Sequence, residues 1–259
     1  MALSGTPQHA VDIPDRVRRL AAGRPVRAVW QNEIGGLTFE VGGGEDRFFV
    51  KWSPTGNLTA EAARMTWAAP FTAVPRVLEH GSGDDGSWLV TAPLPGHSAV
   101  AARWKAVPEV AVTAIGAGLR ALHDALPVAS CPFSWSVSER LSHCLHVDPA
   151  SWHAEHQQLT VEEALEFLAD EPLTDEDLVV CHGDACAPNT LIGDDGRWSG
   201  HVDLGRLGVS SRWADIVIAT WSTEWNYGPG WERTLLDAYG IDPDPVRTRY
   251  YRLLWDLAD

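Results

Sequence analysis

Short apolar stretches, separated by polar residues and glycines, dominate the first third of the chain. These stretches cover residues 27–30, 38–41, 47–51 and 88–91. Glycines at 35–36 and 42–44 interrupt them, as expected between neighbouring strands. Residues 58–69 instead carry apolar side chains at helical spacing. The pattern predicts a small, strand-rich N-terminal part that contains one helix.

The pattern changes to helical spacing from Pro108 onward. Apolar residues there recur at intervals of three and four, which is typical of amphipathic helices. The predicted helices cover residues 108–126, 161–169, 213–223, 231–239 and 245–257. Gly240 marks the end of one helix, and Asp244 with Pro245 marks the start of the next. The second part of the chain is therefore expected to be mainly helical.

Segment 91–96 lies between the strand-rich and the helical parts and contains Pro93 and Pro95. Proline fixes its own backbone and restricts the residue before it, so a regular element is not expected to continue through this segment. We predict a hinge here, with an N-terminal lobe of residues 1–93 and a C-terminal lobe of residues 94–259.

A β-hairpin is predicted within the second part. Residues 177–181 form a short apolar, β-branched run and are expected to be a buried strand. Two further strands are expected at 190–192 and 197–202. The sequence Gly-Asp-Asp-Gly at 193–196 is a strong turn signal and would join them.

Three polar side chains flank this hairpin: Asp184 before it, Asn189 at its entry and Asp203 at its exit. Phosphoryl transfer needs a carboxylate to accept a hydroxyl proton and hard oxygen ligands for Mg²⁺. Asp184 suits the first role, and Asn189 and Asp203 suit the second. These residue types are also common in ordinary turns. The ordered combination of His-Gly-Asp, Asn, hairpin and Asp-x-Gly-Arg favours the functional interpretation, with His182 bracing the loop.

The composition excludes several classes of protein. The chain has 259 residues, of which 45% are hydrophobic and 21% charged, as is usual for a globular protein with one domain or two lobes. No apolar run has the length of a membrane span, and the N-terminus lacks the pattern of a signal peptide. The four cysteines show no C-x-x-C spacing, so free thiols are expected rather than disulfides or zinc ligands. These features favour a cytoplasmic protein.

The net charge of −15 is unevenly distributed. Residues 1–93 carry 9 Lys and Arg against 10 Asp and Glu, whereas residues 94–259 carry 11 against 25. A negative field of this kind repels nucleic acid and anionic membranes and attracts polycations. Acidic surfaces also serve solubility, so charge alone does not identify a cationic ligand.

Several segments along the chain match motifs of one known family. They are residues 48–51, Glu61, and residues 119–123, 131–133, 180–189, 203–206, 239–244 and 250–254. On these segments the chain resembles the aminoglycoside O-phosphotransferases of the protein-kinase-like group, most closely their 3′-hydroxyl branch. The resemblance implies a two-lobed, protein-kinase-like α+β fold. It also implies a nucleotide-binding N-terminal lobe and a C-terminal lobe for catalysis and substrate binding.

The resemblance assigns residues of the first lobe to the nucleotide. Glu61 would hold Lys51 against the α- and β-phosphates, although a surface Lys–Glu pair without function is the alternative. Phe49 matches an aromatic position that packs on adenine. Gly35 and Gly36 lie in a loop that would arch over the phosphates, where glycine permits close backbone approach.

The resemblance also places adenine recognition at Thr91 and Pro93. A carbonyl and an N–H two residues apart read the adenine edge in relatives, but proline has no N–H to donate. The register could shift to Leu94, adenine could be held less tightly, or the purine preference could differ. ATP with Mg²⁺ is the expected donor, and GTP is not excluded.

On the acceptor side, the resemblance implies that the substrate hydroxyl lies against Asp184 and that carboxylates meet its amines. Arg206 matches a family residue near the phosphate and the acceptor, and a structural salt bridge is its alternative role. Glu224 matches one of a pair of acidic substrate residues, whereas Trp225 stands where the second is expected. Asp256 matches a C-terminal acid that reaches into the pocket.

We therefore expect an ATP- and Mg²⁺-dependent kinase of an aminoglycoside hydroxyl, the 3′ hydroxyl first, that confers resistance. A related kinase of another hydroxylated amine or peptide antibiotic is the nearest alternative. A catalytically silent ligand-binding protein is a more distant one. The expected partner is a small cationic aminoglycoside, not nucleic acid or a membrane, and the expected state is a monomer or a weak dimer.

Overall fold

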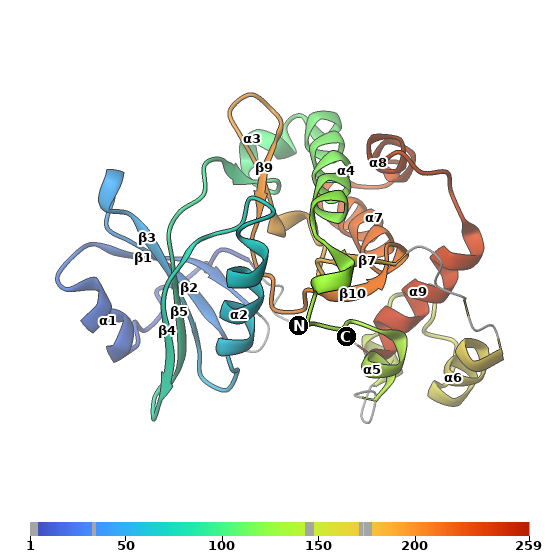
Figure 1. Ribbon diagram of the computed structural model, residues 1–259, viewed down its shortest axis with the longest axis horizontal. Helices are drawn as coiled ribbons and strands as arrows, with labels where there is room; N and C mark the ends of the chain where they lie inside the picture. Colours follow the sequence, from blue (N-terminus) through green and yellow to red (C-terminus); the bar gives the residue numbers. More distant parts are fainter. Residues whose placement is uncertain (1–4, 33–34, 143–147, 171–172, 174–177, 259) are drawn as a thin grey trace. The chain divides into compact units, whose positions relative to one another are not determined.

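The computed structural model describes residues 5–32, 35–142, 148–170, 173 and 178–258, and its elements are labelled in Figure 1. The chain divides into two compact units, Met1–Leu94 and Pro95–Asp259. None of the helices in the described part of the chain has the length and apolar character needed to cross a lipid bilayer.

A five-stranded antiparallel sheet with strand order β1-β2-β3-β5-β4 forms the centre of the first unit. Its elements are α1 (Asp15–Ala21), β1 (Val26–Gln31), β2 (Leu37–Val41), β3 (Phe48–Ser53), α2 (Thr59–Ala68), β4 (Val77–Gly83) and β5 (Gly86–Thr91). All four neighbouring strand pairs are antiparallel. β1, β2 and β3 follow one another along the chain, as do β4 and β5, whereas α2 and β4 lie between β3 and β5.

Alternate residues of this sheet face opposite sides, and the two sides have different environments. Phe39, Val41 and Val50 are fully buried and pack in one cluster with Val17 and Ala21 of α1. Helices α1 and α2 lie on opposite sides of the strands in Figure 1. The sheet therefore has one purely apolar face under α1, which leaves the other face for polar side chains.

The opposite face carries residues that the sequence assigned to nucleotide binding. In the register of β3 and β5, Phe49 pairs with Thr91 and Lys51 pairs with Leu89. Because alternate residues share a face, Phe49 and Lys51 both point away from the cluster under α1. Glu61 of α2 reaches Lys51 from this side.

The second unit is mainly helical and contains two small sheets. Its elements are β6 (His97–Ser98), α3 (Ala102–Lys105), α4 (Pro108–Ala125), α5 (Val137–Leu141), α6 (Val161–Asp170), β7 (Leu178–Cys181), β8 (Thr190–Ile192), β9 (Trp198–His201), β10 (Gly208–Ser211), α7 (Trp213–Tyr227), α8 (Glu232–Tyr239) and α9 (Pro245–Ala258). β10 pairs with β7, and the other sheet has the order β6-β8-β9.

Helix α7 forms the centre of this unit. All its residues from Trp213 to Thr223 are buried, as expected for a helix that is apolar on every side. Helix α4 packs closely on α8, because a Cβ atom on Gly116 would lie only 2.5 Å from the backbone oxygen of Leu235. A buried carboxylate on α7, Asp215, has a fully buried side chain and is the exception to the apolar character of α7.

The fold confirms the predicted α+β class and the order of its main elements. The predicted hairpin is present: β8 and β9 pair through Thr190 and His201, and Gly193 N donates to Arg197 O at 2.8 Å. Gly196 in this turn has φ 77°, a conformation that favours glycine. Asp177, placed by the sequence at the start of the preceding strand, lies outside the described residues.

Sequence patterns missed several elements, namely α1, β4, β6, α3, α5 and β10. Helix α1 has only seven residues and is rich in Arg, so it lacks a clear apolar period. Strand β4 is an edge strand with mostly exposed side chains and little hydrophobic alternation. Strand β10 has four residues, three of them Gly or Ser, which are weak strand formers or neutral.

Candidate functional site

The loop that carries Asp184 begins with a turn held by one carboxylate. Asp215 accepts the backbone N–H of His182 at 2.6 Å with Oδ2 and that of Gly183 at 2.9 Å with Oδ1. Asp215 lies in the first turn of α7, and its side chain is fully buried. This carboxylate therefore fixes the backbone immediately before Asp184.

Gly183 is required by the shape of the same turn. Its φ is 82°, and an added Cβ would lie 2.3 Å from the backbone oxygen of Arg206. Such a contact is far shorter than van der Waals packing permits. The loop of Asp184 and the segment of Arg206 therefore touch through their backbones at a point where no side chain fits.

The ring of His182 connects the loop to the exit of the hairpin. Its Nδ1 accepts the N–H of Asp184 at 3.3 Å, and its Nε2 donates to the backbone oxygen of Val202 at 3.0 Å. An imidazole that accepts at one nitrogen and donates at the other is neutral. His182 therefore ties the backbone of Asp184 to the exit of the hairpin.

Asn189 lies against Asp184 as the sequence suggested. Its Nδ2 donates to the backbone oxygen of Asp184 at 3.0 Å and to Oδ2 at 3.1 Å. Its own backbone oxygen accepts the N–H of Val202 at 3.0 Å, which places the residue beside the start of the Asp203 loop. With the amide nitrogen bound to Asp184, the amide oxygen is the atom that can bind a cation.

Asp203 has a left-handed backbone, with φ 63°. Residues other than glycine rarely adopt this conformation, although Asp and Asn do so more readily than most. Such backbone outliers cluster at functional sites. The conformation follows directly after β9 and sends the chain away from the hairpin into the segment of Leu204 and Arg206.

Arg206 lies between two aromatic rings. Its guanidinium carbon is 5.6 Å from the ring centroid of Trp135 and 5.5 Å from that of Trp255. Both distances fall within the range of cation–π attraction. Neither tryptophan was singled out from the sequence, since an isolated Trp has no spacing that signals a partner.

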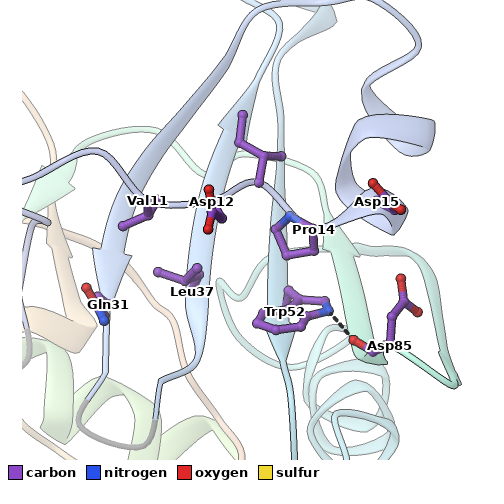
Figure 2. Close-up of a pocket in the computed structure, with 9 residues that line it drawn as sticks. Val11, Asp12, Pro14, Asp15, Gln31, Leu37, Trp52 and Asp85 are labelled. Atoms are coloured by element: carbon purple, nitrogen blue, oxygen red, sulfur yellow. Dashed lines mark hydrogen bonds between the residues drawn. The ribbon is translucent and has the colours of Figure 1, made fainter.

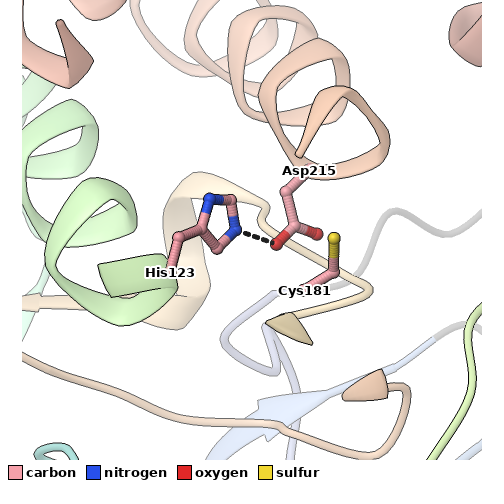
Figure 3. A group of neighbouring side chains, drawn as sticks. All are labelled: His123, Cys181 and Asp215. Atoms are coloured by element: carbon pink, nitrogen blue, oxygen red, sulfur yellow. Dashed lines mark hydrogen bonds and ion pairs between the residues drawn. The ribbon is translucent and has the colours of Figure 1, made fainter. Parts of the chain in front are cut away.

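His123 and Cys181 lie beside Asp215 in Figure 3. One potential ligand atom from each residue lies within 4.8 Å of the others. Each is already bonded: His123 Nε2 is 3.0 Å from Asp215 Oδ2, and Cys181 Sγ is 3.2 Å from the backbone oxygen of Ser211. The donors around Asp215 are backbone amides and an imidazole, so the cluster is a hydrogen-bonded brace rather than a cation site.

The electrostatics of this brace favour an ionised Asp215. Burial alone would raise the pKa of Asp215, but His123, His182 and the Gly183 amide together lower it below its ordinary value. Burial, together with the nearby His182, holds the pKa of His201 well below its ordinary value. Burial and the charge of Asp184 raise the pKa of the Cys186 thiol, which stays protonated beside Asp184.

In the first unit, Lys51 Nζ lies 2.8 Å from Glu61 Oε2. The Glu61 side chain is only 6% exposed and that of Lys51 is 22% exposed, so this is a partly desolvated pair rather than a surface one. Asn32 Oδ1 accepts the N–H of Gly36 at 2.6 Å, and Gly35 has φ 83°. Residues 33–34 of the same loop lie outside the described residues.

The predicted acceptor residues have different environments. The Asp256 side chain is 8% exposed, and its carboxylate accepts the N–H of His153 at 3.2 Å and contacts His156 Nδ1 at 2.6 Å. Trp225 is 52% exposed, with its ring 5.9 Å from that of the buried Trp221. Asp256 therefore already has protein partners, whereas Trp225 faces solvent.

The acceptor region has a link to the catalytic loop that sequence reasoning missed. Ser222 of α7 accepts the N–H of Ala187 at 2.8 Å, so the end of α7 that carries Glu224 and Trp225 lies next to the loop of Asp184. Glu224 is exposed. One signal of this contact was present in the sequence. Ser222 and Trp225 are three residues apart on one helix, so they share one face of it.

A hollow of about 470 Å³ lies elsewhere, in the first unit (Figure 2). Its lining residues are Val11, Asp12, Ile13, Pro14, Asp15, Gln31, Leu37, Trp52 and Asp85. Trp52 Nε1 donates to the backbone oxygen of Asp85 at 3.0 Å. None of these residues was predicted to act on a substrate or cofactor, so this hollow is separate from the candidate site.

Comparisons with known proteins agree with the geometry. Residues 31–251 match the model of the family described as "Phosphotransferase enzyme family". An aminoglycoside 3′-phosphotransferase of Streptomyces fradiae is 34% identical over 252 residues, which cover 88% of this chain and 92% of the relative. A solved aminoglycoside 3′-phosphotransferase of type VIII has a TM-score of 0.78 at 30% identity, covering 94% of this chain and 98% of that one.

A second solved structure has its ligands in place. It is the 3″-type aminoglycoside phosphotransferase of Streptomyces rimosus in complex with ADP and streptomycin. Its TM-score to this chain is 0.69 at 28% identity, covering 86% of this chain and 90% of that one.

Proposed function

The chain belongs to the phosphotransferase enzyme family, and on that premise we propose that it transfers the γ-phosphate of ATP to a hydroxyl of an aminoglycoside. The 3′ hydroxyl is the first candidate, and resistance to the antibiotic is the biological result. The observation that carries the proposal is the placement of Asp184, which follows a turn fixed by Asp215 and is bonded to Asn189.

In this proposal Asp184 positions the acceptor hydroxyl and takes its proton. The two bonds from Asn189 Nδ2 hold the residue, and the brace through His182 keeps its backbone in register with the hairpin. A base must lie within hydrogen-bond reach of the proton it removes, so a rigid loop suits the task. Arg206, held between two rings, would meet charge on the transferring phosphate.

Asn189 and Asp203 would hold Mg²⁺. The donor set fits, because Mg²⁺ prefers a few hard oxygens alongside phosphate oxygens, and these residues offer an amide oxygen and a carboxylate. The bound ion would neutralise charge on the phosphates. The Asn189 amide nitrogen is bonded to Asp184, which leaves the amide oxygen for the ion.

In the first unit, Lys51 would neutralise the α- and β-phosphates, with Glu61 holding its ammonium. Phe49 would pack on the adenine ring, and the backbone of Gly35 and Gly36 would approach the phosphates. Recognition of the adenine edge would fall to the backbone around Thr91 and Pro93.

For the acceptor, Glu224 would meet an ammonium group and the exposed Trp225 ring would pack on a sugar face. Asp256 would act with its two histidine partners, His153 and His156, rather than as an isolated carboxylate. The partner is a small cation in the cytoplasm, and the protein would act as a monomer or a weak dimer.

A 3″ hydroxyl of a streptomycin-like compound is a second candidate acceptor. The likeness to the Streptomyces rimosus enzyme with ADP and streptomycin favours it.

Mass spectrometry tests the proposal directly. Kanamycin-, neomycin-, paromomycin- and streptomycin-like compounds are incubated with the protein, Mg²⁺ and either ATP or GTP. The expected result is the gain of one phosphoryl group by at least one compound, which Asp184→Asn abolishes. If no compound gains a phosphoryl group with either nucleotide, the proposed acceptor class is wrong. Product NMR then distinguishes the 3′ hydroxyl from the 3″ hydroxyl.

A further inference from the structure

The hydroxyl of Tyr239 lies at the end of a chain of hydrogen bonds that reaches the catalytic loop. It lies 2.8 Å from His123 Nδ1 and 3.3 Å from Arg212 Nη1. The rings of Tyr239 and His123 meet edge to face, with centroids 5.6 Å apart. Both side chains are buried, so the protein and not bulk water determines these bonds.

The donors and acceptors in this chain have one consistent arrangement. Asp215 is ionised and can only accept, so His123 must present an N–H from Nε2 toward it. A neutral His123 then has a lone pair at Nδ1, which Tyr239 can satisfy with its O–H. Arg212 has only N–H groups and donates to the Tyr239 oxygen.

The alternative is a doubly protonated His123. In that case Arg212 and His123 would both donate to the Tyr239 oxygen, and the Tyr239 O–H would have no acceptor within this chain of bonds. An unsatisfied buried hydroxyl destabilises the fold. Burial also raises the pKa of Tyr239 to about 12, so the hydroxyl keeps its proton.

We propose that Tyr239 is a positioning residue: its hydroxyl holds the Nδ1 side of the His123 ring and so keeps the Nε2–H aimed at the Asp215 carboxylate that holds the turn before Asp184. The proposal deepens the proposed function, on which its catalytic consequence rests. Without the hydroxyl, Nδ1 has no donor and the ring can turn away from Asp215. The carboxylate would then lose the imidazole bond that supports its contacts with the amides of His182 and Gly183.

The role links an outer helix to the catalytic loop. Tyr239 is the last residue of α8, and Asp215 is in the first turn of α7. A bond to the far nitrogen of a histidine is a known way for a residue without substrate contact to orient the ring and so affect a site. The effect of Tyr239 on His123 and on the turn held by Asp215 can be measured directly, without substrate.

The first experiment uses ¹⁵N-histidine NMR on the full chain without substrate. The wild-type protein is expected to show His123 with its proton on Nε2 and with Nδ1 accepting a hydrogen bond. Tyr239→Phe is expected to move the Nδ1 resonance to that of an unbonded nitrogen and to speed exchange of the Nε2 proton. Tyr251→Phe removes a hydroxyl from another buried tyrosine of the same unit and should leave His123 unchanged. An Nδ1–H form in the wild type, or an unchanged spectrum in Tyr239→Phe, would overturn the proposal.

Amide hydrogen exchange supplies a second measurement. Exchange at His182 and Gly183 should be faster in Tyr239→Phe than in Tyr251→Phe. If both variants lose thermal stability equally and these two amides exchange at the same rate in both, Tyr239 has only a packing role.

The catalytic consequence is tested on whichever acceptor is phosphorylated. Tyr239→Phe should lower kcat by about tenfold with little change in KM, in line with other residues that orient a functional histidine. In a His123→Gln background, the same change should have a smaller effect, because the imidazole that the Tyr239 hydroxyl holds is absent. An equal effect in both backgrounds contradicts the proposal. Absence of any phosphorylated acceptor refutes the proposed function alone, because the NMR result does not depend on substrate.

Discussion

Asp256 Oδ2 lies 2.6 Å from His156 Nδ1, so the acid near the end of the chain is bonded to segment 153–156. The same carboxylate accepts the backbone N–H of His153. Asp256, which the resemblance predicted to bind an amine of the substrate, thus also holds this segment against α9. Its removal should affect structure as well as binding.

Asp256→Asn is expected to lower the free energy of unfolding by about 1–3 kcal/mol, because a buried hydrogen-bonded carboxylate is lost. Chemical denaturation of the two proteins measures this difference. Asp237→Asn is the matched control, since the Asp237 side chain is 56% exposed and its pair with Arg233 is on the surface. Equal stability of Asp256→Asn and the wild type would show that the pair with His156 contributes nothing.

Lys51→Met should lower kcat/KM for the nucleotide by about 10²–10³-fold, because a preorganised cation opposite the phosphates is removed. The only other lysine, Lys105, is exposed on α3 and provides the control. Lys105→Met should leave steady-state kinetics unchanged. Similar kinetics in the two variants would exclude a role for Lys51 in nucleotide binding.

Asp184→Asn should lower kcat by about 10²–10⁴-fold, the usual contribution of a general base. Nucleotide affinity, measured by calorimetry, should remain within a few-fold of the wild type, because this carboxylate acts on the acceptor. Asp195→Asn, in the exposed turn of the same hairpin, serves as the control. Retention of full kcat by Asp184→Asn would require another base.

Gly183→Ala should destabilise the protein far more than a positive φ alone explains. Gly228 has nearly the same φ, 85°, but no atom lies within 4 Å of an added Cβ. Gly228→Ala should therefore cost only the strain of its own backbone, with φ 85° and ψ 175°, which is about 1–3 kcal/mol. Gly183→Ala adds the contact with Arg206, and thermal unfolding of both variants separates the two effects. Equal shifts in Tm would mean that the Arg206 backbone moves freely.

Asp215 should make stability depend on acid pH. Its pKa is lower in the folded protein than in the unfolded chain, so its carboxylate stabilises the fold at pH values above the unfolded pKa of about 3.9. This stabilisation is lost as pH falls through the folded pKa. Denaturation of wild type and Asp215→Asn from pH 3 to 7 should show a difference that is constant near neutrality and shrinks below about pH 4. A difference independent of pH would contradict this.

Local patterns were sufficient to predict the hairpin and its flanking residues. The Gly-Asp-Asp-Gly turn fixes the pairing of β8 and β9, and this pairing brings Asn189 next to the start of the Asp203 loop. Lys51 and Glu61 were also predictable, since a strand and the next helix are close in sequence. In each case the interacting residues are separated by few positions.

The brace around Asp215 could not be predicted in the same way. His123 and Asp215 are 92 positions apart, and only the packing of α4 against α7 brings them together. An acid within the apolar run Trp213–Ala219 was the available signal, because such an acid is buried only when it is paired. The bonds from Asp256 to His153 and His156 were equally unpredictable. These histidines are far from Asp256 in the sequence, and their segment has no regular hydrophobic pattern.

At Asp203, the fit to a left-handed backbone and the negative charge of the side chain can be changed separately. Asparagine accepts the conformation but has no charge, whereas glutamate keeps the charge but is a poorer fit to the backbone. Glycine satisfies the backbone and offers no ligand atom from a side chain. Aspartate is thus the one residue that meets both demands, and a series of these three replacements would measure shape and charge independently at a single point of the chain.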